Sequence, residues 1–168
     1  KECNNTLVKL LACSGNSDLD EYCNVVMSGL LEPESIYETV DALASCIFVQ
    51  TVKAPALAVV MPIILMGLKD RSSDLQRKTC IIIENMCQLV EHPKEILPFY
   101  TALKKNLDYA FETISDPNAR SVCGRSLNIL NNICKDHVDK VYKQTPEDFK
   151  QFANDSELVS VEFKYLSA

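Results

Sequence analysis

Basic side chains gather in the middle of this chain, where they could bind anionic groups. Arg71, Arg77 and Lys78 lie within eight residues of one another, and Lys104 and Lys105 follow as a pair. Arginine and lysine form charge-assisted hydrogen bonds with phosphate and carboxylate oxygens. The sequence therefore offers Arg71, Lys78, Lys104 and Lys105 as candidate binding residues.

No combination of residues typical of an active site is visible. The four glycines are scattered, and none belongs to the phosphate loop G-x-x-x-x-G-K-[ST]. His92 precedes a proline at a predicted helix break, and His137 lies near a predicted helix end. Such positions are typical of exposed or capping residues rather than of general bases. We expect no catalytic residue in this segment.

The cysteines do not suggest a metal site. Eight occur, none in a C-x-x-C pair, and with only two histidines no zinc ligand set has a plausible spacing. Cys80, Cys87, Cys123 and Cys134 lie in or beside apolar helical positions, where a free cysteine acts as a small hydrophobe. This placement predicts reduced thiols in a cytoplasmic protein.

Length and charge limit the remaining functions. A chain of 168 residues fits one compact domain. Its whole net charge of −6 arises in residues 1–50, where there are eight acidic side chains and two lysines. That balance argues against a general nucleic-acid binder but allows a local basic stripe. No apolar run reaches the roughly 18 residues of a membrane span, so no membrane partner is expected. The chain begins with lysine rather than methionine. We therefore interpret it as a piece of a longer protein.

Apolar residues recur at helical spacing in three places about 40 residues apart. The three sets are Ile36, Val40, Leu43 and Ile47; Leu75, Thr79, Ile82, Met86 and Leu89; and Ala119, Cys123, Leu127 and Leu130. Spacings of three and four place each set on one face of a helix. HEAT and armadillo repeats have periods of roughly 40–47 residues. The pattern predicts an all-α HEAT-repeat solenoid of about three antiparallel helix pairs.

Turn residues and prolines delimit the predicted helices. We expect helices from about Asp18 to Leu31, Pro33 to Phe48, Pro55 to Lys69, Ser73 to Glu91, 94–114, and from Pro117 onward. Ser17 or Asp18, Ser72 or Ser73, and Asp116 are the expected caps. Pro62 and Pro98 are expected to kink successive first helices at comparable points. Phe111 is expected in the core.

Two basic residues have a structural alternative. In HEAT repeats a turn aspartate commonly pairs with a basic residue early in the second helix, which links neighbouring repeats. Asp70 with Arg77, and Asp116 with Arg120, have the right positions for this ladder. Arg77 and Arg120 therefore fit a structural role, and the other cations remain candidates for binding.

The pattern changes near residue 137. We assign residues 1–137 to the helical repeats and 138–168 to a short linking segment. In the latter, Thr145 caps a short predicted helix, and Leu158–Leu166 alternates apolar and polar residues as a strand does. A strand needs a partner for its backbone groups. The sheet is expected either in sequence beyond this segment or in a second copy.

Three runs carry a resemblance to a known family. They are MPIILMGLKDR (61–71), QRKTCIIIENMCQLVEHP (76–93) and ISDPNARSV (114–122). They resemble the HEAT-repeat region of translation elongation factor 3, and are also similar to the scaffold that acts in the general-control response to amino-acid starvation. The ending VSVEFKYLSA is similar to the first strand of the leading ATP-binding cassette in elongation factor 3 and its ABC-F relatives.

The resemblance implies a ribosome-binding module that is not itself an enzyme and holds no cofactor. ATP would bind to cassettes elsewhere in the parent protein. Ribosomal RNA and ribosomal proteins would be the partners of Arg71, Lys78, Lys104 and Lys105, with other translation factors as further partners. The alternative is a protein–protein scaffold segment of general-control regulation. Walker motifs after this segment would favour the first, and further HEAT repeats the second.

Overall fold

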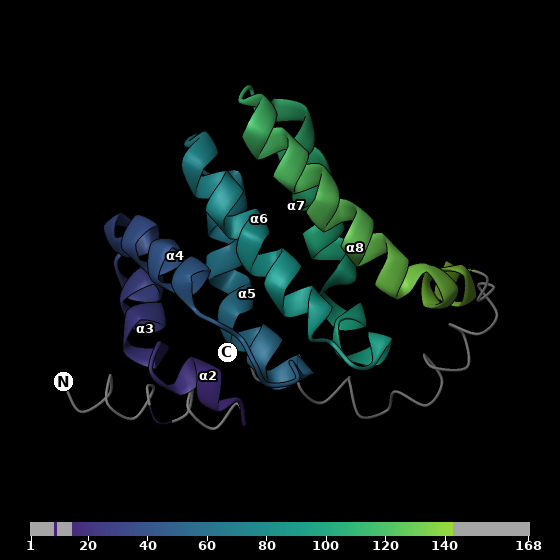
Figure 1. The fold of residues 1–168 in the computed structure, drawn as a ribbon, viewed down its shortest axis with the longest axis horizontal. Helices are drawn as coiled ribbons and strands as arrows, with labels where there is room; N and C mark the ends of the chain where they lie inside the picture. Colours follow the sequence, from purple (N-terminus) through teal and green to yellow (C-terminus); the bar gives the residue numbers. More distant parts are fainter. Residues whose placement is uncertain (1–8, 10–14, 143–168) are drawn as a thin grey trace, which may run out of the picture. The chain divides into compact units, whose positions relative to one another are not determined.

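The computed structural model describes Lys9 and residues 15–142, and among these it contains helices and no strand (Figure 1). The elements are α2 (Ser17–Asp20), α3 (Cys23–Leu31), the 3₁₀ turn η1 (Pro33–Ser35), α4 (Ile36–Ser45), α5 (Ala54–Lys69), α6 (Ser73–Gln88), the 3₁₀ turn η2 (Pro93–Glu95), α7 (Leu97–Thr113) and α8 (Pro117–Tyr142). The predicted short helix after Thr145 and the strand Leu158–Leu166 lie outside the described residues. The chain divides into two compact units, residues 1–134 and 135–168. Helices α2 to α7, and α8 as far as residue 134, lie in the first unit.

The helices form three successive pairs, as the 40-residue period predicts. Helix α3 packs against α4, and α5 packs against α6. Between pairs, α4 contacts α6, and α5 contacts both α3 and α7. Hydrogen bonds tie α8 to its neighbours; among them, Cys123 Sγ donates to the Leu107 carbonyl of α7, and Ser126 Oγ donates to the Cys80 carbonyl of α6. The result is one layer of first helices, α3, α5 and α7, against a layer of second helices, α4, α6 and α8 (Figure 1).

The core follows most of the predicted apolar ladders, but Ile36 and Leu89 are only half-buried and Ile47 is exposed. Val40, Leu43, Ile82 and Met86 are buried, as are all four members of the set on α8. The prediction that Ile47 is buried on this helix is wrong, because α4 ends at Ser45 and Ile47 is 84% exposed. The Asp18 carboxylate accepts hydrogen bonds from the backbone N–H groups of Val49 and Gln50, at 2.7 and 2.8 Å. These bonds hold the segment after Ser45 in a non-helical conformation.

Two further expectations fail for positional reasons. Pro62 lies inside α5, whereas Pro98 lies in the first turn of α7, so the two prolines do not occupy comparable points. The first turn tolerates proline because its N–H would have no intrahelical partner. Phe111 is 41% exposed. The buried face of α7 passes through Leu107 and Ala110 instead, and the next residue is turned away by about 100°.

Side-chain caps begin α6 and α8 where the turn residues predict. Ser72 Oγ accepts from the Leu75 N–H at 3.4 Å, and Asp116 Oδ2 accepts from the Ala119 N–H at 2.7 Å. Both predicted caps are confirmed. At the start of α2 the cap is Asn16, whose Oδ1 accepts from the Asp18 N–H at 3.0 Å, rather than Ser17 or Asp18.

A glycine faces a threonine inside each of the first two pairs. Gly29 of α3 lies against Thr39 of α4, and Gly67 of α5 lies against Thr79 of α6, so closely that a Cβ on either glycine would collide with the threonine side chain. Both threonines are fully buried. Thr79 Oγ1 donates to the Leu75 carbonyl at 2.8 Å, which fixes its side chain. The two helices of a pair therefore approach closely at a point where only glycine fits.

We expect Gly67→Ala to lower the free energy of unfolding by about 1–3 kcal/mol, the usual cost of overpacking a core. Thr79 cannot turn away without losing its hydrogen bond. The matched control is Gly124→Ala in α8, where the added carbon meets only the ring of Phe111 at 3.2 Å. There the helix preference for alanine over glycine, about 1 kcal/mol, should offset the contact. Urea unfolding of both variants tests this, and equal stabilities would refute it.

Candidate anion-binding face

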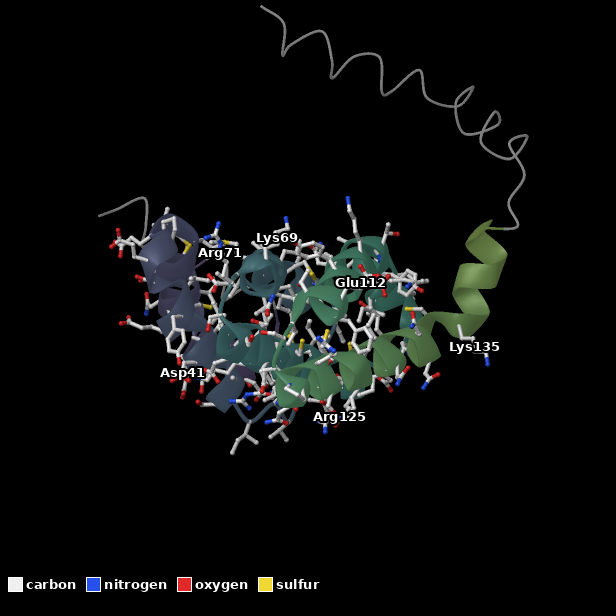
Figure 2. The ribbon with its side chains drawn as sticks, turned by 90° about the horizontal axis from the view of Figure 1, so that it is seen from above. Asp41, Lys69, Arg71, Glu112, Arg125 and Lys135 are labelled. Atoms are coloured by element: carbon white, nitrogen blue, oxygen red, sulfur yellow. The ribbon has the colours of Figure 1, made fainter. Side chains whose placement is uncertain are left out.

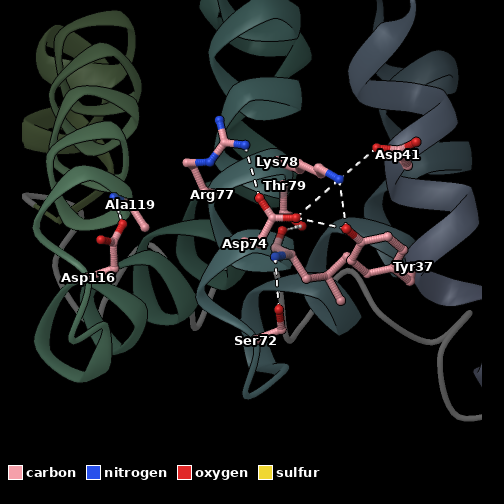
Figure 3. Close-up of polar contacts among 10 residues, drawn as sticks. Tyr37, Asp41, Ser72, Asp74, Arg77, Lys78, Thr79, Asp116 and Ala119 are labelled. Atoms are coloured by element: carbon pink, nitrogen blue, oxygen red, sulfur yellow. Dashed lines mark hydrogen bonds and ion pairs between the residues drawn. The ribbon is translucent and has the colours of Figure 1, made fainter.

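Tyr37 and Asp41 of α4 form one polar cluster with Asp74, Arg77 and Lys78 of α6, between neighbouring repeats (Figure 3). Lys78 Nζ lies 2.7 Å from Asp41 of α4 and 3.1 Å from Asp74 one turn earlier in α6. It also donates to Tyr37 Oη at 2.9 Å and lies 4.5 Å from the centre of that ring. Tyr37 Oη in turn donates to Asp74 Oδ2 at 2.9 Å. Arg77 bonds the other oxygen of Asp74 at 3.0 Å.

This cluster changes the role of Lys78. Its side chain is 18% exposed, and its contacts with Asp41, Tyr37 and Asp74 raise its pKa. The hydrogen bonds from Arg77, Tyr37 and Lys78 lower the pKa of Asp74 to about 2. Lys78 therefore joins two repeats. Its ammonium group is already engaged within the protein, and its role in binding an outside ligand stays a prediction.

The pKa of Asp74 leads to a prediction about acid stability. Because the folded-state pKa lies below the ordinary value of 3.8, folding favours the ionised form. That contribution is present above pH 4 and is lost as the pH falls toward 2. We expect Asp74→Asn to be less stable than the parent at pH 7, and to lose less stability between pH 4 and pH 2. Solvent screens this partly exposed cluster, so the difference should be modest. Thermal unfolding at pH 7, 4 and 2 measures it, and parallel curves would contradict it.

The predicted ladder pairs do not form. Arg77 pairs with Asp74, while Asp70 Oδ1 accepts from the Ser72 N–H at 2.7 Å. Arg120 donates through two of its nitrogens to the Ile114 carbonyl. The other expected partner, Asp116, is used as the cap of α8. Both aspartates thus satisfy backbone groups at the turns, and both arginines find partners close in sequence.

Links between repeats come from other residues. Lys78 joins Asp41 across α4 and α6. Arg125 of α8 reaches Glu84 of α6 at 3.5 Å. Figure 2 shows Asp41 and Arg125 along the same side of the molecule. Ion pairs of the second-helix layer thus join each pair of neighbouring repeats.

The other predicted cations differ in exposure. Lys104 bonds Asp108 one turn later in α7 at 2.7 Å. Lys105 is exposed on α7, and Arg71 is exposed in the turn between α5 and α6. Neither Arg71 nor Lys105 forms an ion pair with any residue in the described part of the chain.

Arg71 lies on the side of the molecule opposite the Lys78 cluster. In Figure 2, Lys69, Arg71 and Glu112 lie along one edge, and Asp41 and Arg125 lie along the other. A hollow of about 230 Å³ on the first edge is lined in part by Lys69, Arg71, Gln76 and Tyr109. We name the surface formed by Lys69, Arg71, Lys105 and Tyr109 the α5–α7 face.

Sequence reasoning missed two members of this face. Lys69 is the last residue of α5, and Tyr109 of α7 is 58% exposed. Tyr109 follows Lys105 by four residues, the spacing that places two side chains on one side of a helix. This spacing of Lys105 and Tyr109 is the sequence feature from which Tyr109 could have been predicted to lie beside a basic residue. The approach of Lys69 to Tyr109 depends on the packing of α5 against α7.

The described residues offer little support for a catalytic, metal-binding or membrane-spanning role. His92 is exposed beside η2, and the side chain of His137 lies outside the described residues. Among the described residues, no group of three or more histidine, cysteine or carboxylate side chains could hold a metal ion. Within the same residues, no helix combines the length and apolar character needed to cross a bilayer.

Comparison with known proteins gives one family. A family model described as "Elongation factor 3/GNC1 HEAT repeat" matches residues 35–141. Elongation factor 3 of Pneumocystis carinii is 38% identical over 125 residues, which cover 74% of this chain and 12% of the relative. Elongation factor 3 of Candida glabrata is 34% identical, covering 79% of this chain and 13% of the relative. Elongation factor 3A of Saccharomyces cerevisiae is 36% identical, covering 70% and 11%. The chain thus spans about an eighth of the length of these relatives.

Proposed function

Because this chain belongs to the elongation factor 3/GNC1 HEAT repeat family, we propose that it is a ribosome-binding module of an elongation-factor-3-like ABC-F protein that acts in translation. Ribosomal RNA and ribosomal proteins are its partners, other translation factors can join them, and it works in the cytoplasm. The module is non-catalytic and holds no cofactor. Hydrolysis of ATP belongs to cassettes elsewhere in the parent protein.

The observation that carries the proposal is the unequal use of cations on the two layers. On the second-helix layer, Lys78 and Arg125 are held in ion pairs between repeats. On the α5–α7 face, Lys69, Arg71 and Lys105 are exposed and form no ion pair with the described residues. Cations held by no structural partner can bind phosphates without first breaking a contact. They therefore support binding through the α5–α7 face rather than through Lys78.

The chemistry of this face suits the ribosome. Phosphate contacts from arginine and lysine supply affinity without reading sequence, and they position a protein on folded RNA. Acidic segments of ribosomal proteins present carboxylates to the same side chains. The acidic residues concentrated in 1–50 would be repelled by RNA, so the orientation is set by charge as well as by shape.

Co-sedimentation with purified ribosomes over a range of salt concentrations tests the proposal. If phosphates are the acceptors, the logarithm of the binding constant should fall linearly with the logarithm of the salt concentration, because each neutralised phosphate releases counterions. The parent protein and the 168-residue chain should both show this slope. Binding that does not change between low and high salt would overturn the phosphate contact.

A second candidate function is a protein–protein scaffold of the general-control type. It is favoured by exposed apolar residues at the link between α4 and α5, where Ile47 and Val49 are 84% and 74% exposed. A hollow of about 350 Å³ beside them is lined by Ile47, Phe48 and Leu89 among others. Exposed apolar surface next to a hollow is typical of protein contacts. Replacing Ile47 and Val49 by serine would weaken a scaffold interaction, and it would leave ribosome binding through the α5–α7 face unchanged.

A further inference from the structure

The hollow on the α5–α7 face is built from segments of two successive repeats. The end of α5 contributes Lys69, the turn contributes Asp70 and Arg71, and the end of α7 contributes Tyr109. Its volume of about 230 Å³ is smaller than the roughly 300 Å³ at which pockets for drug-sized ligands begin. The space suits a single flat group with a charged substituent rather than a folded ligand.

The charges around the hollow favour an anion. Lys69 and Arg71 are exposed, and neither forms an ion pair with a described residue. The acidic residue that lines the hollow, Asp70, accepts a hydrogen bond from the Ser72 N–H at 2.7 Å. This bond occupies one of its carboxylate oxygens. Glu112 lies along the same edge in Figure 2 but does not line the hollow. Two cations therefore outweigh one carboxylate within the hollow itself.

Two further groups point to a base rather than to a carboxylate. Tyr109 lines the hollow with a ring that is 58% exposed, and an exposed ring beside cations is how proteins stack unpaired bases. Gln76 also lines the hollow and is 5% exposed. Its Nε2 donates to the Leu68 carbonyl at 3.2 Å, so its Oε1 is the amide atom left to accept a hydrogen bond. The amino group of a base can supply that bond.

We propose that this hollow binds one unpaired RNA nucleotide, with the phosphate at Lys69 and Arg71 and the base stacked on Tyr109. The proposal rests on the ribosome binding proposed above and adds the kind of RNA that is recognised. Bases inside a duplex are already stacked and paired, so a duplex can offer phosphates to Lys69 and Arg71 but no base to Tyr109. The hollow should therefore distinguish single-stranded from double-stranded RNA.

The test measures binding of the 168-residue chain to labelled oligoadenylate, to an RNA duplex and to an oligoglutamate peptide by fluorescence anisotropy. Tyr109→Ala should weaken oligoadenylate binding about tenfold, the usual effect of losing one stacking ring, and should leave duplex binding unchanged. Tyr109→Phe should bind like the parent. Phe111→Ala is the matched control, because Phe111 is also a partly exposed ring of α7 but does not line the hollow. Thermal unfolding confirms that each variant is folded.

The outcomes separate this proposal from ribosome binding in general. If Tyr109→Ala binds oligoadenylate as the parent does, or if Phe111→Ala is weakened equally, the nucleotide proposal is overturned while ribosome binding can still stand. If the oligoglutamate peptide binds more tightly than the RNA, the occupant is an acidic protein segment and the proposal is again overturned. Failure of ribosome binding itself would appear when the longer protein that contains this chain is co-sedimented with ribosomes, whether or not Tyr109 is replaced.

Discussion

Reversing two charges on the α5–α7 face should weaken ribosome binding by about tenfold or more at low salt. The variant is Arg71→Glu with Lys105→Glu, and both side chains are exposed. Each lost phosphate contact lowers the salt slope by about one, so the slope should fall by about two. The melting temperature should stay close to that of the parent, because neither residue has an ion-pair partner among the described residues.

The matched control reverses Lys53 and Lys94. Both are exposed, and the change in net charge is the same. They lie at the beginnings of α5 and α7, Lys53 as the N-cap of α5 and Lys94 within η2, whereas Lys69 and Tyr109 lie toward the other ends. If the control weakens ribosome binding as much as the test variant, the effect follows overall charge. The α5–α7 face would then have no special role.

Lys78 offers a contrast within the same experiment. Lys78→Glu would place a third carboxylate beside Asp41 and Asp74, where the parent has the cation that joins them. Loss of stability should therefore appear before any specific loss of binding. Of the four cations that sequence reasoning proposed for binding, Lys78 is the one that joins neighbouring repeats. A lower melting temperature of the Lys78→Glu variant would show this structural role.

The periodic part of the fold was predictable because helical packing repeats in sequence. Leu75 and Ile82, or Cys123 and Leu130, lie on one face of a helix whatever their partners are, and these residues are buried. The caps at Ser72 and Asp116 were predictable for a similar reason. A cap depends on an acceptor side chain two or three residues before an unpaired N–H.

Interactions between distant residues were not predictable from periodicity. Ile47 continues the spacing of Val40 and Leu43, but the bonds from Asp18 to Val49 and Gln50 span more than 30 residues in sequence. The pattern of one segment contains no information about such a partner. Helix α4 therefore ended earlier than the spacing suggested.

The candidate site was predictable only in part, for the same reason. Arg71 and Lys105 could be identified as cations of two helical segments, but which acidic side chains would reach Lys78 depended on the stacking of α4 against α6. Choosing between Asp70 and Asp74 as the partner of Arg77 required the geometry of the turn. Tyr109 could be recognised as part of the candidate site only when the structure placed it in one hollow with Lys69 and Arg71 at the end of α5.

The buried thiols give the second large effect. The six described cysteines are free and buried, and Cys80 and Cys123 have no exposed surface. A hydrogen bond with Cys123, together with burial, raises the pKa of the Cys80 thiol, and burial raises the pKa of Cys87 to about 12. Because the thiolate is the reactive form, Cys80 and Cys87 must become both exposed and ionised before they can be alkylated. The hydrogen bond with Cys80 lowers the pKa of the Cys123 thiol, so burial is what protects Cys123.

We expect native-state alkylation of Cys80 and Cys123 to be slower than in urea by a factor on the order of 10³ or more. Labelling requires opening of the helices that cover them, and global opening costs about 5–15 kcal/mol. Cys46 should react first among the six. It is the C-cap of α4, next to the exposed Ile47, and is itself slightly exposed, so a local opening suffices. Mass spectrometry of digested protein after timed labelling identifies each site. Rapid labelling of Cys80, or disulfide bridges among these six cysteines in freshly purified non-reduced protein, would show that the helices do not pack as described.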